Sequence, residues 1–118
     1  MRLFNLFVAF FIFSSSFIVC GNDSSNSQKE WYVGGNLHKA NIKEWKNATG
    51  QNRIATASDM ALSVPSIKIK VQQSGNIDTA KIYATELSEC INKATEEQNT
   101  EHLKVSEIAA QCIVLMQW

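Results

Sequence analysis

Two cysteines, Cys90 and Cys112, have the spacing of a disulfide between neighbouring helices. Each lies in a segment of helical hydrophobic periodicity, and a short polar stretch around Glu101 joins the two segments. Residues at equal distances from the turn of an antiparallel helix pair lie side by side, and Glu101 is midway between the two cysteines. We therefore expect their Cα atoms to approach the ~5.5–6 Å that a disulfide requires, and the bond to stabilise the domain by about 3 kcal/mol. The alternative is two free thiols that pack as small apolar side chains.

The third cysteine, Cys20, ends an apolar N-terminal stretch that predicts export. Residues 1–20 combine one arginine, a run rich in phenylalanine and a short exit, which is the layout of a secretory signal peptide. The segment Phe17–Cys20 resembles a bacterial lipobox, except that Val19 occupies a position where lipoproteins usually carry a small residue. We therefore predict a lipid on Cys20, which would anchor the protein to the membrane. The alternatives are cleavage after Gly21, which would release a soluble secreted protein, and an uncleaved membrane span.

A row of polar residues in the front half of the chain is a candidate binding site. Arg53 and Asp59 in this row could together bind a ligand or a partner protein. Polar rows on helices are more often structural or solvated, and in that case we expect Arg53 to pair with Glu86 or Glu89. The row consists of Asn52, Thr56 and Asp59 on one side of a predicted helix, with Arg53 beside it.

Trp31 and Trp45 are a second candidate, because both are large and lie in the front half of the chain. Together with Tyr32 they could form an exposed binding patch for a protein or a small ligand. The alternative is that these aromatic side chains seal the core of a small domain.

Composition and spacing argue against several classes of function. Lys and Arg together number 11, as do Asp and Glu, so no basic surface for nucleic acid is expected. His38 and His102 lack the spacing of metal ligands, and we expect neither a metal nor another cofactor. The sequence has no recognisable Ser-His-Asp or Cys-His grouping and no phosphate-binding glycine loop, so no enzyme activity is predicted.

These candidate residues need a scaffold, and the periodicity predicts a mainly α-helical one. Residues 21–30, rich in Ser and Asn, would be a flexible tether after the signal peptide. The remaining residues, 31–118, are enough for one domain. We predict three helices over about 41–64, 79–95 and 101–117, an extended N-terminal arm, and an extended segment over 66–72.

Capping and proline signals support the start and the end of the helix predicted over 41–64. Asn41 and Glu44 have the spacing of a capping box, and Pro65 disfavours helical geometry at the residue before it. Gly50 falls inside the first predicted helix, where a kink or a break is possible. Apolar and polar residues alternate from Ile67 to Val71, and this alternation favours an extended segment.

The two later helices carry the cysteines. Asp78 can cap the helix that follows it. The last helix is the most apolar, so we expect it to be the most enclosed. Its predicted buried stripe consists of Val105, Ile108, Ala109, Cys112, Leu115 and Met116.

Most of the domain is similar to small exported bacterial proteins of unknown function, and its outline is similar to that of periplasmic acid-stress chaperones. The first resemblance implies an extracytoplasmic location and no particular activity. We therefore expect an exported, lipid-anchored interaction module in the bacterial periplasm or cell envelope. A stress-type chaperone is the alternative, and a small enzyme is the third class. The stretches that carry the resemblance are Leu37-His38, Glu44-Trp45, Ala48, 52–56, Asp59, 84–91 and 106–112.

Overall fold

The structure, a computed structural model, describes residues 30–118. This part of the chain is mainly helical, and its one β-type pairing is an isolated bridge. Cys20, and with it the predicted signal peptide, lipid anchor and most of the tether, lies outside the described residues. The elements are α2 (Ile42–Asn47), α3 (Gly50–Leu62), α4 (Pro65–Ser74), α5 (Thr79–Ala94), a short 3-10 helix (Gln98–Thr100) and α6 (Val105–Leu115).

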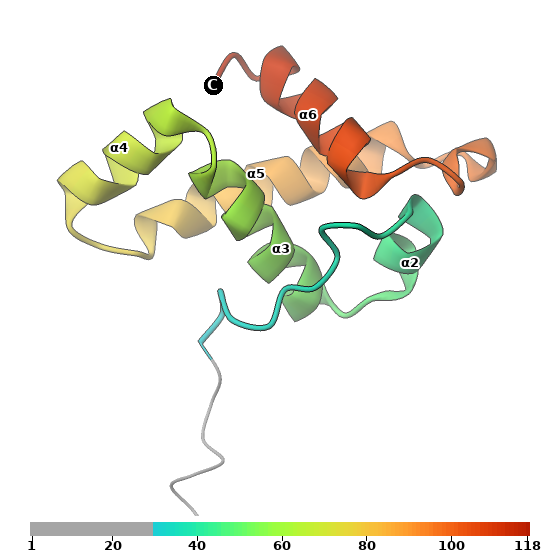
Figure 1. Ribbon diagram of the computed structural model, residues 1–118, viewed down its shortest axis with the longest axis horizontal. Helices are drawn as coiled ribbons and strands as arrows, with labels where there is room; N and C mark the ends of the chain where they lie inside the picture. Colours follow the sequence, from blue (N-terminus) through green and yellow to red (C-terminus); the bar gives the residue numbers. More distant parts are fainter. Residues whose placement is uncertain (1–29) are drawn as a thin grey trace, which may run out of the picture.

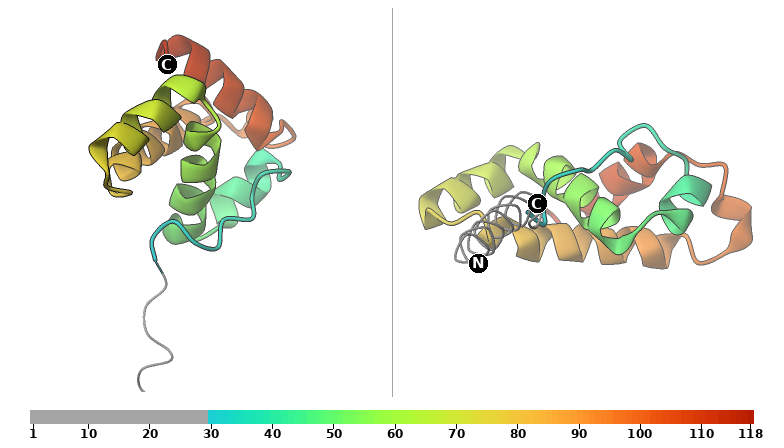
Figure 2. Two further views of the ribbon diagram at one scale, coloured as in Figure 1. Left: turned by 60° about the vertical axis from the view of Figure 1, so that its left-hand side comes forward. Right: turned by 90° about the horizontal axis from the view of Figure 1, so that it is seen from below.

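Helix α5 is the centre of the fold, because α3, α4 and α6 all pack against it (Figures 1 and 2). The buried apolar side chains form two clusters. We call the first the main cluster, and its buried members come from the N-terminal arm, α2, α3, α5 and α6: Leu37, Ala40, Ile42, Trp45, Ala57, Ala84, Leu87, Ile91, Val105, Ile108, Ala109 and Cys112. The second, the α4 cluster, consists of Ala61, Ile67, Val71 and Ala80.

The single helix predicted over 41–64 is wrong, because the chain forms two helices there. The capping box at its start is confirmed: Asn41 Oδ1 accepts from Glu44 N and Glu44 Oε1 accepts from Asn41 N, both at 2.9 Å. Helix α2 ends at Asn47, and Ala48 is extended with ψ 165°. The Thr49 hydroxyl then caps α3 by accepting from Asn52 N at 3.1 Å. Of the kink or break left open at Gly50, the structure shows a break just before it, with Thr49 as a second capping residue.

The extended segment predicted over 66–72 is also wrong, because these residues belong to helix α4. Pro65 occupies the first turn, where its missing N–H leaves no bond unmade, and Gly75 ends the helix with φ 69°. Ile67 and Val71 are four residues apart, and both are buried on one side. Ile69, which the alternating pattern placed with them, is 51% exposed. Ile67 and Val71 fit both periods, whereas Ile69 fits only the strand period. Pro65 at the start and Gly75 at the end are both typical of a helix.

The second predicted helix, over 79–95, is confirmed as α5. Its expected cap is not formed, because the Asp78 carboxylate makes no capping hydrogen bond and instead accepts from Trp31 Nε1 at 3.0 Å. The last helix begins at Val105 rather than at Glu101. The residues before it pair with the start of α2 through an antiparallel bridge between Asn41 and Lys104.

The N-terminal arm runs over the helices without a helix or strand of its own, with turns at Trp31 and His38, and its contact with α3 is close. A Cβ atom on Gly35 would lie 2.5 Å from the backbone nitrogen of Thr56, so only glycine fits against the helix there. Further along the arm, Leu37 and Ala40 are buried in the main cluster. The arm is therefore part of the folded domain and not a loose extension of the tether.

Candidate binding groove beside the disulfide

The predicted polar row on α3 holds the N-terminal arm. Asn52 Oδ1 accepts from Asn36 N at 3.0 Å, and Asn52 Nδ2 donates to Asn36 Oδ1 at 2.8 Å. One turn further on, the buried Thr56 hydroxyl accepts from Leu37 N at 3.2 Å. The structural interpretation of this row is therefore correct, although the partner is the arm and not another helix.

Asp59 completes the row by pairing with a histidine of the arm. His38 Nε2 lies 2.9 Å from Asp59 Oδ2, and the two side chains are 40% and 51% exposed. This is the one salt bridge among residues 30–118, so the expected pairing of Arg53 with Glu86 or Glu89 is not formed. The half-buried Arg53 makes no hydrogen bond or ion pair with Asp59, and a joint role of the two in binding stays a prediction.

The two tryptophans do not form a common exposed surface. Trp45 is 0% exposed, and its Nε1 donates to Asn92 Oδ1 at 2.8 Å, so the prediction of a binding patch that includes Trp45 is wrong. The alternative, that this side chain seals the core, describes it correctly. Trp31 is half-buried between the two clusters, and Lys81 Nζ lies 5.7 Å from the centre of its ring. Both rings thus serve the packing of the domain.

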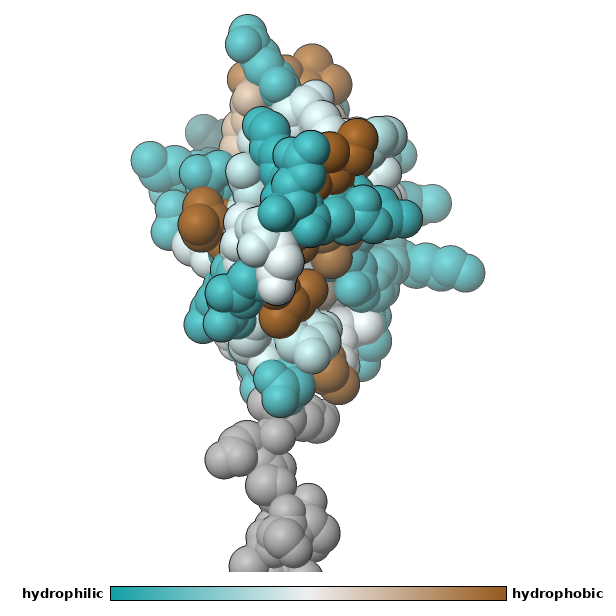
Figure 3. All heavy atoms as spheres, turned by 90° about the vertical axis from the view of Figure 1, so that its left-hand side faces the viewer, coloured by the Kyte–Doolittle hydropathy of each residue, from teal (hydrophilic) through white to brown (hydrophobic). Residues whose placement is uncertain are grey.

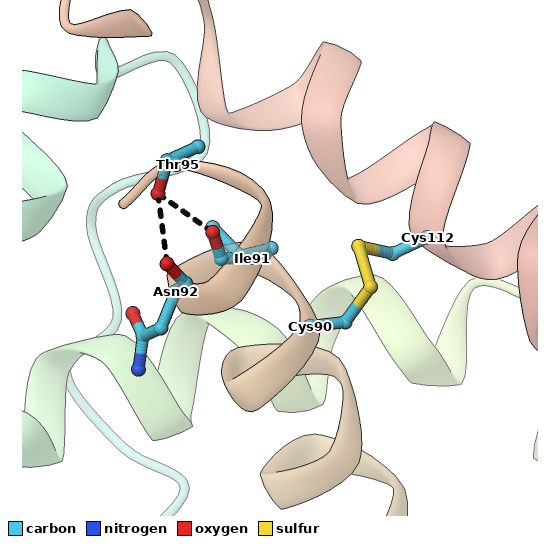
Figure 4. The surroundings of a disulfide bond; sticks show 5 residues. All are labelled: Cys90, Ile91, Asn92, Thr95 and Cys112. Carbon is cyan, nitrogen blue, oxygen red and sulfur yellow. Dashed lines mark hydrogen bonds between the residues drawn. A yellow bond between two sulfur atoms is a disulfide. The ribbon is translucent and has the colours of Figure 1, made fainter. Parts of the chain in front are cut away.

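The predicted disulfide between Cys90 and Cys112 is present and joins α5 to α6 (Figure 4). The Cα atoms are 6.0 Å apart, as the antiparallel arrangement of the helices requires. Cys112 is buried with 1% exposure, whereas Cys90 is half-buried. One turn after Cys90, the buried Thr95 hydroxyl donates to Ile91 O at 2.6 Å, and α5 ends there. The bond therefore lies near the end of α5, where it holds the second half of α6.

A groove of about 730 Å³ opens beside this disulfide, between α5 and the end of the chain. Its α5 side carries charged side chains around Cys90. Its other side is apolar and comes from the residues at and after the end of α6. The lining residues are Glu86, Glu89, Cys90, Lys93 and Ala94 on one side, and Leu115, Met116 and Trp118 on the other.

The apolar side of the groove continues onto the outer face of α6. Val114 is 75% exposed and Leu115 is 76% exposed, the highest values among the large apolar residues of the described chain. Both line a second hollow of about 470 Å³ with Ala110 and Gln111. Leu115 belongs to both hollows, so the exposed apolar surface is continuous across the last turns of α6.

These exposed residues correct the prediction that the last helix is the most enclosed. Val105, Ile108, Ala109 and Cys112 are buried as expected, but Leu115 is not and Met116 is only half-buried. The helix has more apolar residues than its contacts with α5 can cover. The groove could have been found in the sequence from these surplus apolar residues. Periodicity alone placed them in the core instead.

The lining of the groove combines charged and apolar side chains. Its lining holds two carboxylates, one ammonium group and apolar surface, and the sulfur of Cys90 is in the disulfide. No nucleophile and base face each other among these side chains. Within residues 30–118, His, Cys, Asp and Glu side chains form no cluster of three that could hold a metal ion.

The comparisons with known proteins leave the family open: no family model matches the chain, and no curated protein or solved structure matches it either. None of the helices within residues 30–118 is both long enough and apolar enough to cross a membrane. The disulfide is consistent with an oxidising compartment outside the cytoplasm.

Proposed function

We propose that this protein is a small exported binding module, anchored to the cell envelope by a lipid on Cys20. Its binding surface is the groove beside the disulfide together with the adjoining face of α6. The N-terminal arm begins on the opposite side of the domain from the end of α6 (Figures 1 and 2). A chain tethered through the arm can therefore present this groove to a partner away from its attachment point.

The observation that carries this proposal is a pair of exposed apolar side chains on a helix end that is covalently held. Val114 and Leu115 are both about three-quarters exposed, at 75% and 76%. The disulfide holds α6 two residues earlier, and Trp118 packs edge-on against Tyr83 of α5 with ring centres 5.5 Å apart. Exposed apolar surface on a fixed support is typical of interaction sites, because a partner can bury it without first ordering it.

A stress-type chaperone is the second candidate, because it too would use exposed apolar surface. The two functions differ in the number of partners: an interaction module has one or a few, whereas a chaperone binds many unfolded chains. An enzyme receives less support, since the residues lining the groove offer no paired nucleophile and base.

Site-specific crosslinking in living cells tests the proposal. A photoreactive amino acid in place of Leu115 is expected to give one or a few discrete adducts when the native chain is expressed with its anchor. The matched control is the same amino acid in place of Ile69, which is 51% exposed on α4 and lines neither hollow. The Leu115 adduct should disappear when Val114→Asn is added.

Three results would count against an interaction module. Equal adducts from positions 115 and 69 would show that the groove is not the binding surface. A smear of many adducts, with suppression of aggregation of unrelated proteins by the purified domain, would favour the chaperone. Persistence of the adduct in the Val114→Asn variant would remove the outer face of α6 from the site.

A further inference from the structure

The α5 side of the groove carries more negative than positive charge. Glu86 and Glu89 lie about one helical turn apart, and both are exposed. Lys93 is the one cation among the lining residues. Neither carboxylate takes part in an ion pair with any residue from 30 to 118. Two acidic groups at the rim of an apolar groove are therefore available to a ligand.

The opposite side supplies no charged side chain to match them. Leu115 and Trp118 line it, and Val114 continues it along α6. A ligand that fills the groove must therefore bring an apolar surface on one side and cationic groups beside it. An amphipathic helix has this distribution, and grooves between two helices commonly accept such segments.

We infer that the groove binds a cationic amphipathic segment of another exported protein, with Lys or Arg side chains beside Glu86 and Glu89 and apolar side chains against Leu115. The inference rests on the proposed function, and it adds the chemistry of the partner. Oppositely charged rims orient a ligand and speed its association more than they tighten it. We therefore expect binding that weakens as salt is added.

A second copy of this chain fits the groove less well. In a two-fold contact of groove against groove it would bring Glu86 and Glu89 again, so like charges would meet across the contact. The groove has eight lining residues and the outer hollow of α6 has four, with Leu115 in both. A stable dimer uses roughly 20 or more residues on each side. The size of the surface fits a peptide segment better than a whole folded subunit.

A membrane surface is also a poor match. Anionic lipid headgroups attract basic rather than acidic protein surfaces. Glu86 and Glu89 would be repelled there. We therefore make binding to lipid vesicles an outcome of the test rather than part of the inference.

The test uses two synthetic helical peptides with the same leucine and alanine face. One carries lysine on its polar face, and the other carries glutamate at the same positions. Each is added to the isotope-labelled chain from Asn22 onward, which contains all of the residues that the structure describes, including both cysteines of the disulfide. The measurement is the change in the NMR signals of the Leu115 methyl groups and the Trp118 indole. At equal peptide concentrations we expect clearly larger changes with the lysine peptide than with the glutamate peptide.

Charge variants give the matched control. Glu86→Gln with Glu89→Gln should weaken binding of the lysine peptide by about five- to tenfold and reduce its salt dependence. Glu97→Gln with Glu107→Gln makes the same change in net charge at two exposed positions that do not line the groove. This control should bind as the unaltered chain does.

The outcomes separate this inference from the proposed function. Equal binding of both peptides, lost in each case with Leu115→Asn, overturns the charge inference and leaves the groove as a binding surface. Equal weakening by the two pairs of glutamine variants also overturns it. Signal changes with anionic vesicles, or the absence of any change with the lysine peptide, reject the cationic segment, and the crosslinking at position 115 then decides the proposed function separately.

Discussion

Helices α4 and α6 both pack on α5, but they are held in different ways. α4 lies between Pro65 and Gly75, and it is anchored by two buried side chains. Its end of the molecule shows small apolar spots separated by hydrophilic side chains (Figure 3). α6 has a disulfide, a β-bridge at its start and a surplus of apolar residues that stay exposed. Packing accounts for the position of α4, whereas α6 combines covalent attachment with a surface left open for a partner.

The largest effect is expected at the anchor of α4. Ile67→Ala should destabilise the domain by about 2–5 kcal/mol, because Ile67 is 0% exposed and its removal leaves a cavity in the α4 cluster. Urea unfolding followed by tryptophan fluorescence measures this change. Ile69→Ala on the same helix is the control, and it should change the free energy of unfolding by less than about 0.5 kcal/mol. Similar losses for both variants would contradict the helical assignment of this segment.

The next largest effect concerns the disulfide. Replacing both cysteines with alanine should destabilise the domain by about 3 kcal/mol, because the unfolded chain gains the freedom that the cross-link removes. Amide hydrogen exchange should show faster opening of α6 than of α4 in this variant. If both helices open equally fast, the disulfide does not act locally on α6. That result would contradict the view that α6 is held by the disulfide and α4 by packing.

A smaller effect is expected at the end of α4. Gly75 has φ 69°, and a Cβ atom added there would have no other atom within 4 Å, so Gly75→Ala strains the backbone without a clash. We expect a loss of about 1 kcal/mol in the free energy of unfolding. Gly75→Asn should lose less, since asparagine tolerates this conformation. Equal losses for the two variants would mean that the left-handed conformation does not control the stability of α4.

The smallest effect on stability is expected on the exposed face of α6. Leu115→Asn should change the free energy of unfolding by less than about 0.5 kcal/mol, because the side chain is already 76% exposed. The same change should abolish the crosslink from the native chain when the photoreactive residue is placed at Val114. A large loss of stability would instead make Leu115 part of the core and would remove the main support for the proposed function.

The parts of the fold that sequence reasoning predicted correctly depend on short-range patterns. The capping box of Asn41 and Glu44 is one of these, and so is the apolar repeat of α5. The cysteine pair was also predictable, because two helices joined by a short connection must lie antiparallel. In each case the deciding residues are close in sequence or are symmetric about one turn.

The errors arise where one pattern allows two structures. Ile67, Ile69 and Val71 together fit one side of a strand, whereas Ile67 and Val71 without Ile69 fit one face of a helix. Only the packing against α5 shows that Ile69 lies outside the buried face. The polar row on α3 was recognised, but its partners on the arm lie 16, 19 and 21 residues earlier in the chain. No local rule connects positions so far apart.

The sequence by itself determined that the body of this protein is helical, where α2 begins and α5 runs, and which two cysteines can meet, because capping, periodicity and antiparallel symmetry act over short distances. Only the tertiary structure decided which apolar residues are covered. Periodicity gives a helix an apolar face, but neighbouring elements must lie against that face to bury it. Here the disulfide places the end of α6 beside the second half of α5, and no element within residues 30–118 covers the outer side of its last turns. Val114 and Leu115 therefore remain at the surface, with Leu115 near Glu86 and Glu89.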